Sequence, residues 1–475
     1  MTQQRLSLIT KVAYEVGEMG TVIPISIAVF FLLYFLTDVA GLSPTLAGAV
    51  LLVGRAWDAI NDPLIGWLSD RTRSRWGRRY PWIALGSIPL AFCCALQWLV
   101  PSLSSQLGLF LYYSLVSLIA YAAFSAVQLP FAALVVDLTP DDDERTSLMG
   151  FKSGFNIVGS LLGLVLAQIV FAQIPDIRQQ YLTLGWLTAL IILITIPLCI
   201  WGTYDSAHTR AGIRPAPNPK IASGAKQSPS AGHTRRVIDP RAMNPKSKIL
   251  PPLPPLLTLF TRPFLWLLGL YLCAWVGIQI AAAMLPYFVS NWMQLPEQHF
   301  TQMAMTVQGT AVLSLPLWLS LTQKTSKKRV YLIGAPIAWM GLLGLSWLQP
   351  GQWVWMYGLA IAVGLGLAPF YLVPLAMLPD VIDYDTAQTG LRREGLYFSF
   401  LMFFQKVGLA IALFLVGRCL DIAGFVNGAT SQSAAALLTI RLLMGCLPAV
   451  FMVGGVYCAW QYPLSRQVLL QKPPL

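Results

Sequence analysis

Charged residues are scarce in this chain. They make up 11% of its 475 residues, whereas a soluble domain carries about a quarter. Hydrophobic residues make up 56%, and apolar runs of about twenty residues recur along the chain. These features exclude an ordinary soluble fold and predict an all-α, polytopic membrane protein.

Motifs of catalysis and metal binding are also missing. The seven cysteines form no CxxC pair and lie in or beside apolar segments, so we interpret them as small apolar residues. The three histidines lie in expected loops, and neither an HExxH nor a nucleophile-elbow motif occurs. We therefore expect neither enzymatic activity nor a cofactor.

The N-terminus lacks the features of a signal peptide. MTQQRLSLITKVAYEVGEMG has no short apolar core followed by a small-residue cleavage site, so we expect the first apolar segment to remain as a span. The net charge of +12 lies in short loops between spans, where basic residues set topology. We therefore expect the partners to be the lipid bilayer and a small-molecule substrate, with no nucleic acid.

The apolar segments predict twelve spans. They run approximately over residues 12–37, 45–69, 80–101, 106–138, 148–173, 180–203, 263–291, 302–321, 329–348, 352–379, 396–417 and 435–462. The spans form two sets of six, which predicts an N-terminal bundle (1–203), a flexible basic linker (204–260) and a C-terminal bundle (261–475). Alternatively, the linker is a basic strip that binds lipid headgroups.

Loop charges indicate the orientation. Five arginines follow the second span, whereas the loops near 38–44, 101–106 and 349–352 carry neither Lys nor Arg. The positive-inside rule then places both termini in the cytoplasm, although Arg418 runs against it. We expect a monomer in the cell (inner) membrane.

Three charges interrupt the second span, in GRAWDAINDPLIG. Asp58 and Asp62 are four residues apart and share one helical face, with Arg55 three residues before Asp58. Each charge at the bilayer centre costs about 2.5–3.5 kcal/mol, so this face has to meet a cavity, a partner charge or a cation. Two carboxylates favour a shared cation or proton, and oxygen ligands suit Na⁺. Alternatively, Arg55 and Lys406 neutralise the two acids and only lock helices together.

Lys406 lies ten residues into the eleventh span and needs an acidic partner or a route to water. Asp58 and Asp62 are the best candidates, because few other acids lie at comparable depth.

Further polar residues are candidates for a substrate cavity. Glu18 either lines a cavity or faces the surface, and Glu15 faces cytoplasmic water. Gln128 precedes a proline deep in the fourth span and lines the cavity. Lys152 either snorkels to the surface or has a functional role. Tyr397 is a candidate for stacking against a substrate ring.

The two halves share a pattern of acidic and basic residues. In the first half, a proline and a run of acids precede Arg145 and Lys152; in the second, Pro374 and several aspartates precede Arg393 and Lys406. Weak internal symmetry of this kind is typical of transporters built from repeats.

These motifs resemble a known family. RAWDAINDPLIGWLSDRTRSRWGRR is similar to the second-span signature of the glycoside–pentoside–hexuronide:cation symporters (melibiose-permease-like) of the major facilitator superfamily. LPDVIDYDTAQTGLRREG, followed by the lysine of FFQKVG, resembles that family's signature around the eleventh span. The resemblance implies twelve helices in two six-helix bundles, with Na⁺, Li⁺ or H⁺ bound at Asp58 and Asp62 and Lys406 beside them.

The resemblance also implies a cytoplasmic gate that includes Arg145. The residues we assign to this gate are Asp70, Arg71, Arg78, Asp137, Arg145, Asp380, Asp383 and Arg393.

The chain departs from the melibiose-permease branch where that branch holds its sugar. Val22 and Gln128 stand where the branch has two aspartates, and Ser153, beside Lys152, stands where it has an arginine. VGRAWDAINDPLIG also resembles the sodium-dependent lysophospholipid transporters. The sequence thus predicts cation-coupled symport of a sugar or glycoside by alternating access, with a lysophospholipid or other amphiphile as the alternative substrate.

Overall fold

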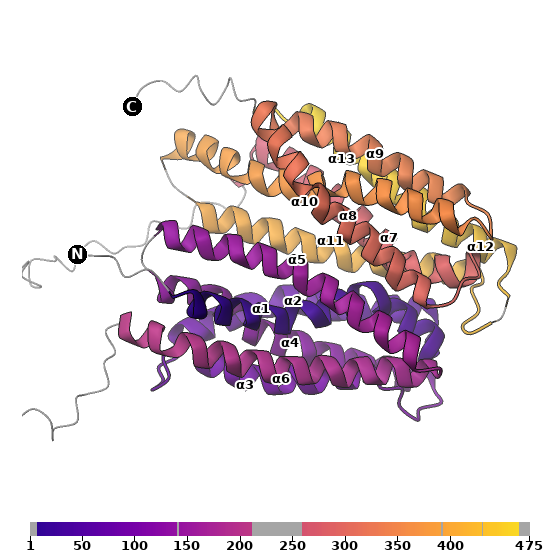
Figure 1. The fold of residues 1–475 in the computed structure, drawn as a ribbon, viewed down its shortest axis with the longest axis horizontal. Helices are drawn as coiled ribbons and strands as arrows, with labels where there is room; N and C mark the ends of the chain where they lie inside the picture. Colours follow the sequence, from indigo (N-terminus) through magenta and orange to yellow (C-terminus); the bar gives the residue numbers. More distant parts are fainter. Residues whose placement is uncertain (1–6, 140–141, 211–258, 391–392, 430, 465–475) are drawn as a thin grey trace, which may run out of the picture.

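The computed structural model describes residues 7–139, 142–210, 259–390, 393–429 and 431–464, without the side chains of 136–137, 142–147, 149–150, 153 and 205–210. Within these ranges every regular element is helical (Figure 1). The predicted linker lies mostly outside the described residues, so its flexibility stays a prediction.

The helices of the first half make six spans. They are α1 (Leu8–Tyr34) with the π-helical turn η1 (Phe35–Val39), α2 (Pro44–Arg71), α3 (Tyr80–Gln97), α4 (Gln106–Leu138), α5 (Asp142–Gln173) and α6 (Ile177–Arg210).

The helices of the second half make six more. They are α7 (Arg262–Tyr287) with η4 (Phe288–Trp292), α8 (Gln298–Lys324), α9 (Lys327–Trp347), α10 (Trp353–Thr389), α11 (Glu394–Ile422), and α12 (Ala434–Arg441) joined through η5 (Leu442–Cys446) to α13 (Leu447–Gln461). The predicted all-α fold of twelve spans is therefore confirmed.

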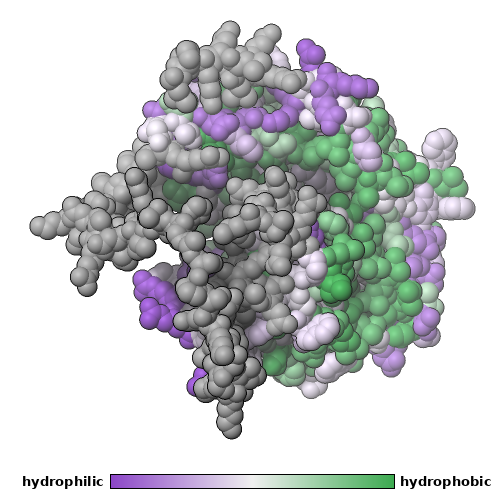
Figure 2. Space-filling view, turned by 60° about the vertical axis from the view of Figure 1, so that its left-hand side comes forward, coloured by the Kyte–Doolittle hydropathy of each residue, from purple (hydrophilic) through white to green (hydrophobic). Residues whose placement is uncertain are grey.

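The chain is a multi-pass integral membrane protein. Within the described residues, eleven of the spans are long and apolar enough to cross a bilayer on composition alone. The twelfth is α2, which has sufficient length at 28 residues but carries Arg55, Asp58 and Asp62 in its middle. Figure 2 shows apolar side chains over a broad stretch of the surface, where a soluble protein would be polar.

Serine side chains set the start of several helices. The hydroxyl oxygens of Ser7, Ser43, Ser105, Ser326 and Ser433 each accept a hydrogen bond from the backbone N–H three residues on. Such caps satisfy donors that the first helical turn leaves unpaired.

The end of α10 differs from the prediction. We expected the span to stop near Pro379, but the helix continues to Thr389 through three prolines, Pro369, Pro374 and Pro379. Packed neighbours in a membrane bundle can satisfy the backbone groups that proline frees, so proline does not end a span there. The extension carries Asp385 into a buried position.

Glycines bring the two halves into close contact. A Cβ on Gly417 of α11 would collide with the carbonyl oxygen of Pro44, and one on Gly48 would lie 3.0 Å from the backbone of Phe414. Helices α2 and α11 therefore pack backbone against backbone near the start of α2, which is possible only without side chains at these positions.

The two halves are also joined at what we call the sealed end, defined by Asp38, Thr45, Tyr287, Asp421 and Gly428. The Thr37 hydroxyl lies 2.7 Å from the Tyr287 hydroxyl, and the Gly428 N–H donates to Asp38 Oδ1 at 3.4 Å. Thr45 donates a hydrogen bond to Asp421. These contacts lie at the end of the molecule that holds α12 in Figure 1.

Candidate cation and substrate site

A lysine from one half meets two aspartates from the other. Nζ of Lys406 in α11 lies 2.9 Å from Oδ2 of Asp58 and 2.5 Å from Oδ2 of Asp62, both in α2. Asp58 is 1% exposed, whereas Asp62 and Lys406 are 27% and 23% exposed. The structure thus brings together the three residues that the sequence pairs across the halves.

Ser125 of α4 completes this cluster, and the sequence analysis missed it. Its hydroxyl lies 2.7 Å from Oδ1 of Asp62 and 3.3 Å from Oδ1 of Asp58. A signal for it was available, because Tyr121, Ser125 and Gln128 follow the i, i+4, i+7 spacing of one helical face. The helical face that carries Gln128 therefore extends back to Ser125 and Tyr121.

The donor set suits a small hard cation. Asp58, Asp62 and Ser125 offer only oxygen atoms, which Na⁺ prefers over nitrogen or sulfur. Two carboxylates and one ammonium leave the cluster with one net negative charge, and one added monovalent cation or proton would neutralise it. Within the described ranges, no three His, Cys, Asp or Glu side chains gather as they would for a bound metal cofactor.

Arg55 has a different partner from the one we expected. Its guanidinium carbon lies 5.2 Å from the centre of the Tyr121 ring in α4, an aromatic contact. In the part of the chain that the structure describes, Asp58 and Asp62 both form their ion pair with Lys406. Tyr121 therefore holds the Arg55 side chain, while the Arg55 charge still acts on Asp58 through space.

Arg55 and Tyr121 line a small cavity between the halves. The cavity has a volume of about 30 Å³, which is room for about one or two water molecules. Its lining is otherwise aliphatic apart from Gln279: Ala28, Val29, Leu32, Leu33, Leu51, Ala283, Leu409 and Leu413.

A second polar cluster joins α1, α4 and α5. Oε2 of Glu18 lies 3.5 Å from Nζ of Lys152 and accepts a 3.5 Å hydrogen bond from Nε2 of Gln128. Glu18 is 2% exposed, so its surface alternative is wrong, and Lys152 pairs inside the bundle instead of snorkelling. Three of the predicted cavity residues therefore come together.

The other two predicted cavity residues lie elsewhere in the packing. Val22 packs against Gly159 of α5. Tyr397 is fully buried, and its ring meets Phe264 of α7 edge to face at 4.9 Å. In this conformation both side chains fill space between helices, and neither lines the cavity beside Arg55.

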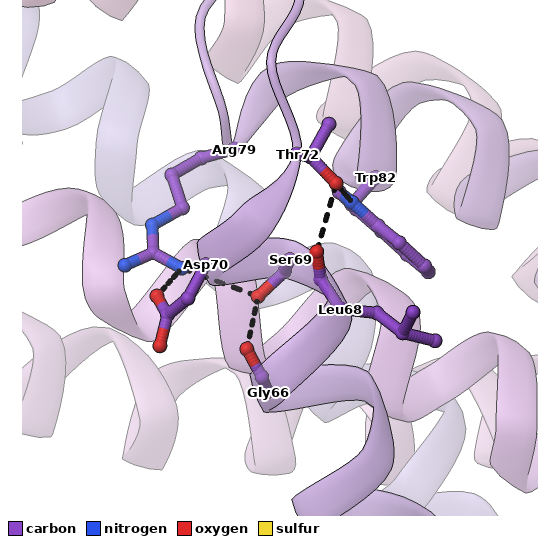
Figure 3. Close-up of polar contacts among 7 residues, drawn as sticks. All are labelled: Gly66, Leu68, Ser69, Asp70, Thr72, Arg79 and Trp82. Carbon is purple, nitrogen blue, oxygen red and sulfur yellow. Dashed lines mark hydrogen bonds and ion pairs between the residues drawn. The ribbon is translucent and has the colours of Figure 1, made fainter.

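Of the predicted gate residues of the first half, Asp70 lies in a polar cluster where α2 ends (Figure 3). Arg79 forms a 2.7 Å ion pair with Asp70 and donates to Ser69 Oγ at 3.2 Å. Arg71 lies over the ring of Trp67, 4.0 Å from its centre, and Arg78 is exposed. Sequence reasoning missed Arg79, which is the arginine that holds Asp70, and the role of Arg78 in a gate stays a prediction.

The gate residues of the second half form two pairs. Lys327 lies 2.8 Å from Oδ2 of Asp380, and Arg393 binds both carboxylate oxygens of Asp385 at 2.5 and 2.9 Å. These hydrogen bonds raise the pKa of the Arg393 guanidinium. Asp383 is exposed.

Each pair described for these gate residues joins two residues of the same half. The side chains of Asp137 and Arg145 lie outside those described, so their part in a gate between the halves stays a prediction.

Comparison with known proteins gives the family. The profile of the family described as MFS/sugar transport protein matches residues 13–234 and 256–466. The chain belongs to this family. It is therefore a transport protein of the major facilitator superfamily, whereas the narrower assignment to the glycoside–pentoside–hexuronide symporters stays a prediction.

Several relatives match over nearly the whole chain. An uncharacterized symporter of Synechocystis sp. is 38% identical, covering 98% of this chain and 96% of the relative. The sodium-dependent lysophosphatidylcholine symporter 1-B of Danio rerio is 27% identical, and the sphingosine-1-phosphate transporter MFSD2B of Xenopus tropicalis is 26% identical; each match covers 98% of this chain and 89% of the relative.

A solved structure supports the fold. The crystal structure of the nucleoside transporter NupG superposes with a TM-score of 0.59 at 12% identity, over 98% of this chain and 100% of that one. At this identity the likeness shows the major facilitator fold alone.

Proposed function

We propose that this protein is a symporter that couples substrate movement to Na⁺ or H⁺ bound at Asp58 and Asp62. The observation that carries the proposal is the position of Lys406, which comes from the opposite half and contacts both carboxylates. A cation that binds these carboxylates has to displace the ammonium, and this weakens one link between the halves. Cation binding and the arrangement of the halves are then thermodynamically linked.

The coupling follows from charge. The cluster carries one net negative charge with Lys406 in place, and separating Lys406 without a replacement leaves two carboxylates in the interior. An uncompensated buried charge costs about 3–5 kcal/mol. A bound cation removes most of this cost, so the rearrangement of the halves proceeds when the site is loaded.

We infer that the substrate is an amphiphile with an anionic head and an aliphatic tail, such as a lysophospholipid. The cavity beside the cation site holds only about one or two water molecules in this conformation and has to widen for such a substrate, but its lining is aliphatic apart from Gln279 and the Arg55 guanidinium. A guanidinium is a good ligand for phosphate. The two vertebrate relatives that carry lysophosphatidylcholine and sphingosine-1-phosphate support this inference.

A sugar or glycoside is the second candidate. Glu18, Gln128 and Lys152 offer the hydrogen-bonding groups that sugar hydroxyls require, and they are gathered from three helices. We further propose that the protein is a monomer in the inner membrane with both termini cytoplasmic, and the positive loops support this orientation of the termini.

The test is uptake into proteoliposomes of purified protein. Lysophosphatidylcholine and a panel of glycosides are supplied with an inward gradient of Na⁺, of H⁺ or of neither. We expect Asp58→Asn and Asp62→Asn to abolish cation-stimulated uptake of the amphiphile, while Asp176→Asn, which neutralises an exposed acid just before α6, leaves it unchanged. Normal cation-driven accumulation by both α2 variants would refute the proposed cation site, and uptake of glycosides alone would select the second candidate.

A further inference from the structure

Glu15 of α1 is a buried acid for which the proposed transport cycle has no use. The sequence suggested that it faces water, but in the structure it is 0% exposed. Neither of its carboxylate oxygens has a hydrogen-bond partner among the described residues. The expectation was wrong because α4, α5 and α6 pack around this turn of α1.

The groups around Glu15 come from four helices. Glu18 and Lys152 are the charged residues whose fields act on it, from α1 and α5. From α6 the neighbouring titratable group is the Cys199 thiol. From its own helix there is also Tyr14, whose hydroxyl donates to the backbone oxygen of Phe131 in α4.

Lys152, the cation whose charge acts on Glu15, is already engaged. Lys152 is paired with Glu18, which also accepts a hydrogen bond from Gln128. An ionised Glu15 would therefore be a buried carboxylate with a like charge one turn away and no hydrogen bond of its own. Burying such a group as an ion costs far more than burying it as a neutral acid, so it takes up a proton.

We propose that Glu15 is a proton-binding site of this transporter, separate from Asp58 and Asp62. In the conformation described here Glu15 is neutral, with its proton bound to a carboxylate oxygen. Its O–H bond breaks and the proton passes to water when a movement of α5 against α1 admits water to this turn, because the new carboxylate is then hydrated while Lys152 stays paired with Glu18. Any movement of α5 against α1 then changes proton binding.

This site goes beyond the proposed cation coupling and needs neither a known substrate nor a loaded Asp58–Asp62 cluster. The proposal predicts that the packing of α1 against α5 depends on pH independently of the Asp58–Asp62 cluster.

The direct test is an infrared titration of the purified full-length protein in detergent, from about pH 5 to about pH 9. We expect a component of the C=O absorption of protonated carboxylic acids that disappears as the pH rises and is missing in Glu15→Gln, whereas the component of Glu297 remains in that variant. Glu18→Gln frees Lys152 to pair with Glu15, so the absorption should disappear at a lower pH. Asp383→Asn is the matched control and should leave the titration unchanged.

Thermal unfolding supplies an independent readout. Ionisation of Glu15 at alkaline pH costs stability in the wild type but cannot occur in Glu15→Gln. The melting temperature of the wild type should therefore fall more than that of the variant between about pH 6 and about pH 9. An unaltered infrared titration in Glu15→Gln, or equal loss of melting temperature in both proteins, overturns the proposal. Neither measurement involves uptake, so failure of the proposed function would be seen separately.

Discussion

The same side chain has different roles in this protein because its surroundings differ. Asp58 is buried against a lysine from the other half, Asp385 is buried in a bidentate pair with Arg393, and Asp383 is exposed. Sequence position alone ranked Asp383 with the gate and left Asp385 out of it. The distinction comes from burial, because an acid that leaves water has to find a partner or a proton.

At the scale of single residues, Lys406→Met should show how much the lysine ammonium stabilises the cation cluster. Without the ammonium, Asp58 and Asp62 repel each other inside the bundle, and we expect a loss of about 3–5 kcal/mol of stability in the absence of Na⁺. Added Na⁺ should then raise the melting temperature more in the variant than in the wild type. Thermal unfolding across a Na⁺ series measures this, with Lys324→Met, an exposed lysine, as control. A smaller Na⁺-dependent rise in Lys406→Met would contradict cation binding by these two acids.

At the scale of elements, α2 and α11 form the junction on which the site depends. Helix α2 supplies the two carboxylates and α11 the lysine, and the glycines Gly48 and Gly417 set their separation. Helix α4 adds a stripe of Tyr121, Ser125 and Gln128 against the same region. The geometry of the cluster is therefore a property of three packed helices.

We predict that Gly417→Ala disturbs this junction, because the new methyl group meets the carbonyl oxygen of Pro44. Overpacking of this kind costs about 1–3 kcal/mol, so the melting temperature and the rate of uptake should both fall. Gly395→Ala in the same helix is the matched control, since a Cβ there meets nothing within 4 Å. If the two variants behave alike, the close crossing of α2 and α11 is not what holds the halves in this arrangement.

At the scale of the whole molecule, the two halves are held together at the sealed end. Aromatic rings from both halves meet there, with Phe31 of α1 centred 5.6 Å from Phe300 of α8 and Tyr34 centred 5.3 Å from Tyr287. Glu297, in the loop before α8, lies near these groups. Burial raises the pKa of its carboxyl to about 7, against a smaller opposing effect of the Gln180 side chain.

This pKa predicts a pH dependence of stability with a definite sign. The folded protein holds the Glu297 proton more tightly than the unfolded chain, whose carboxyl has a pKa of 4.5, so the contribution is fully present below about pH 4.5 and is lost as pH rises to about 7. Glu297→Gln stays neutral, so its melting temperature should increasingly exceed that of the wild type across this window. Asp176→Asn, an exposed acid at the start of α6, should show no such trend. If the difference in melting temperature between Glu297→Gln and the wild type stays constant across this pH range, Glu297 does not titrate there.

Much of the architecture followed from the pattern of apolar residues. The positions of all twelve spans and the pairing of Lys406 with Asp58 and Asp62 were foreseeable from residue type and spacing. The errors share one cause. Each feature that the sequence analysis missed depends on which face of a helix meets which neighbouring helix. These features are the role of Ser125, the aromatic partner of Arg55, the burial of Glu15 and the length of α10.

The sequence by itself determined that this is a membrane protein of twelve helices with charges in its interior, because the cost of moving apolar and charged groups between water and lipid depends on composition and order. Only the tertiary structure decided which charges meet. Lys406 lies 344 residues from Asp62 in the chain, and its ammonium reaches that carboxylate because α11 packs against α2. Electrostatic energy depends on separation in space and on local burial, and a linear sequence records neither.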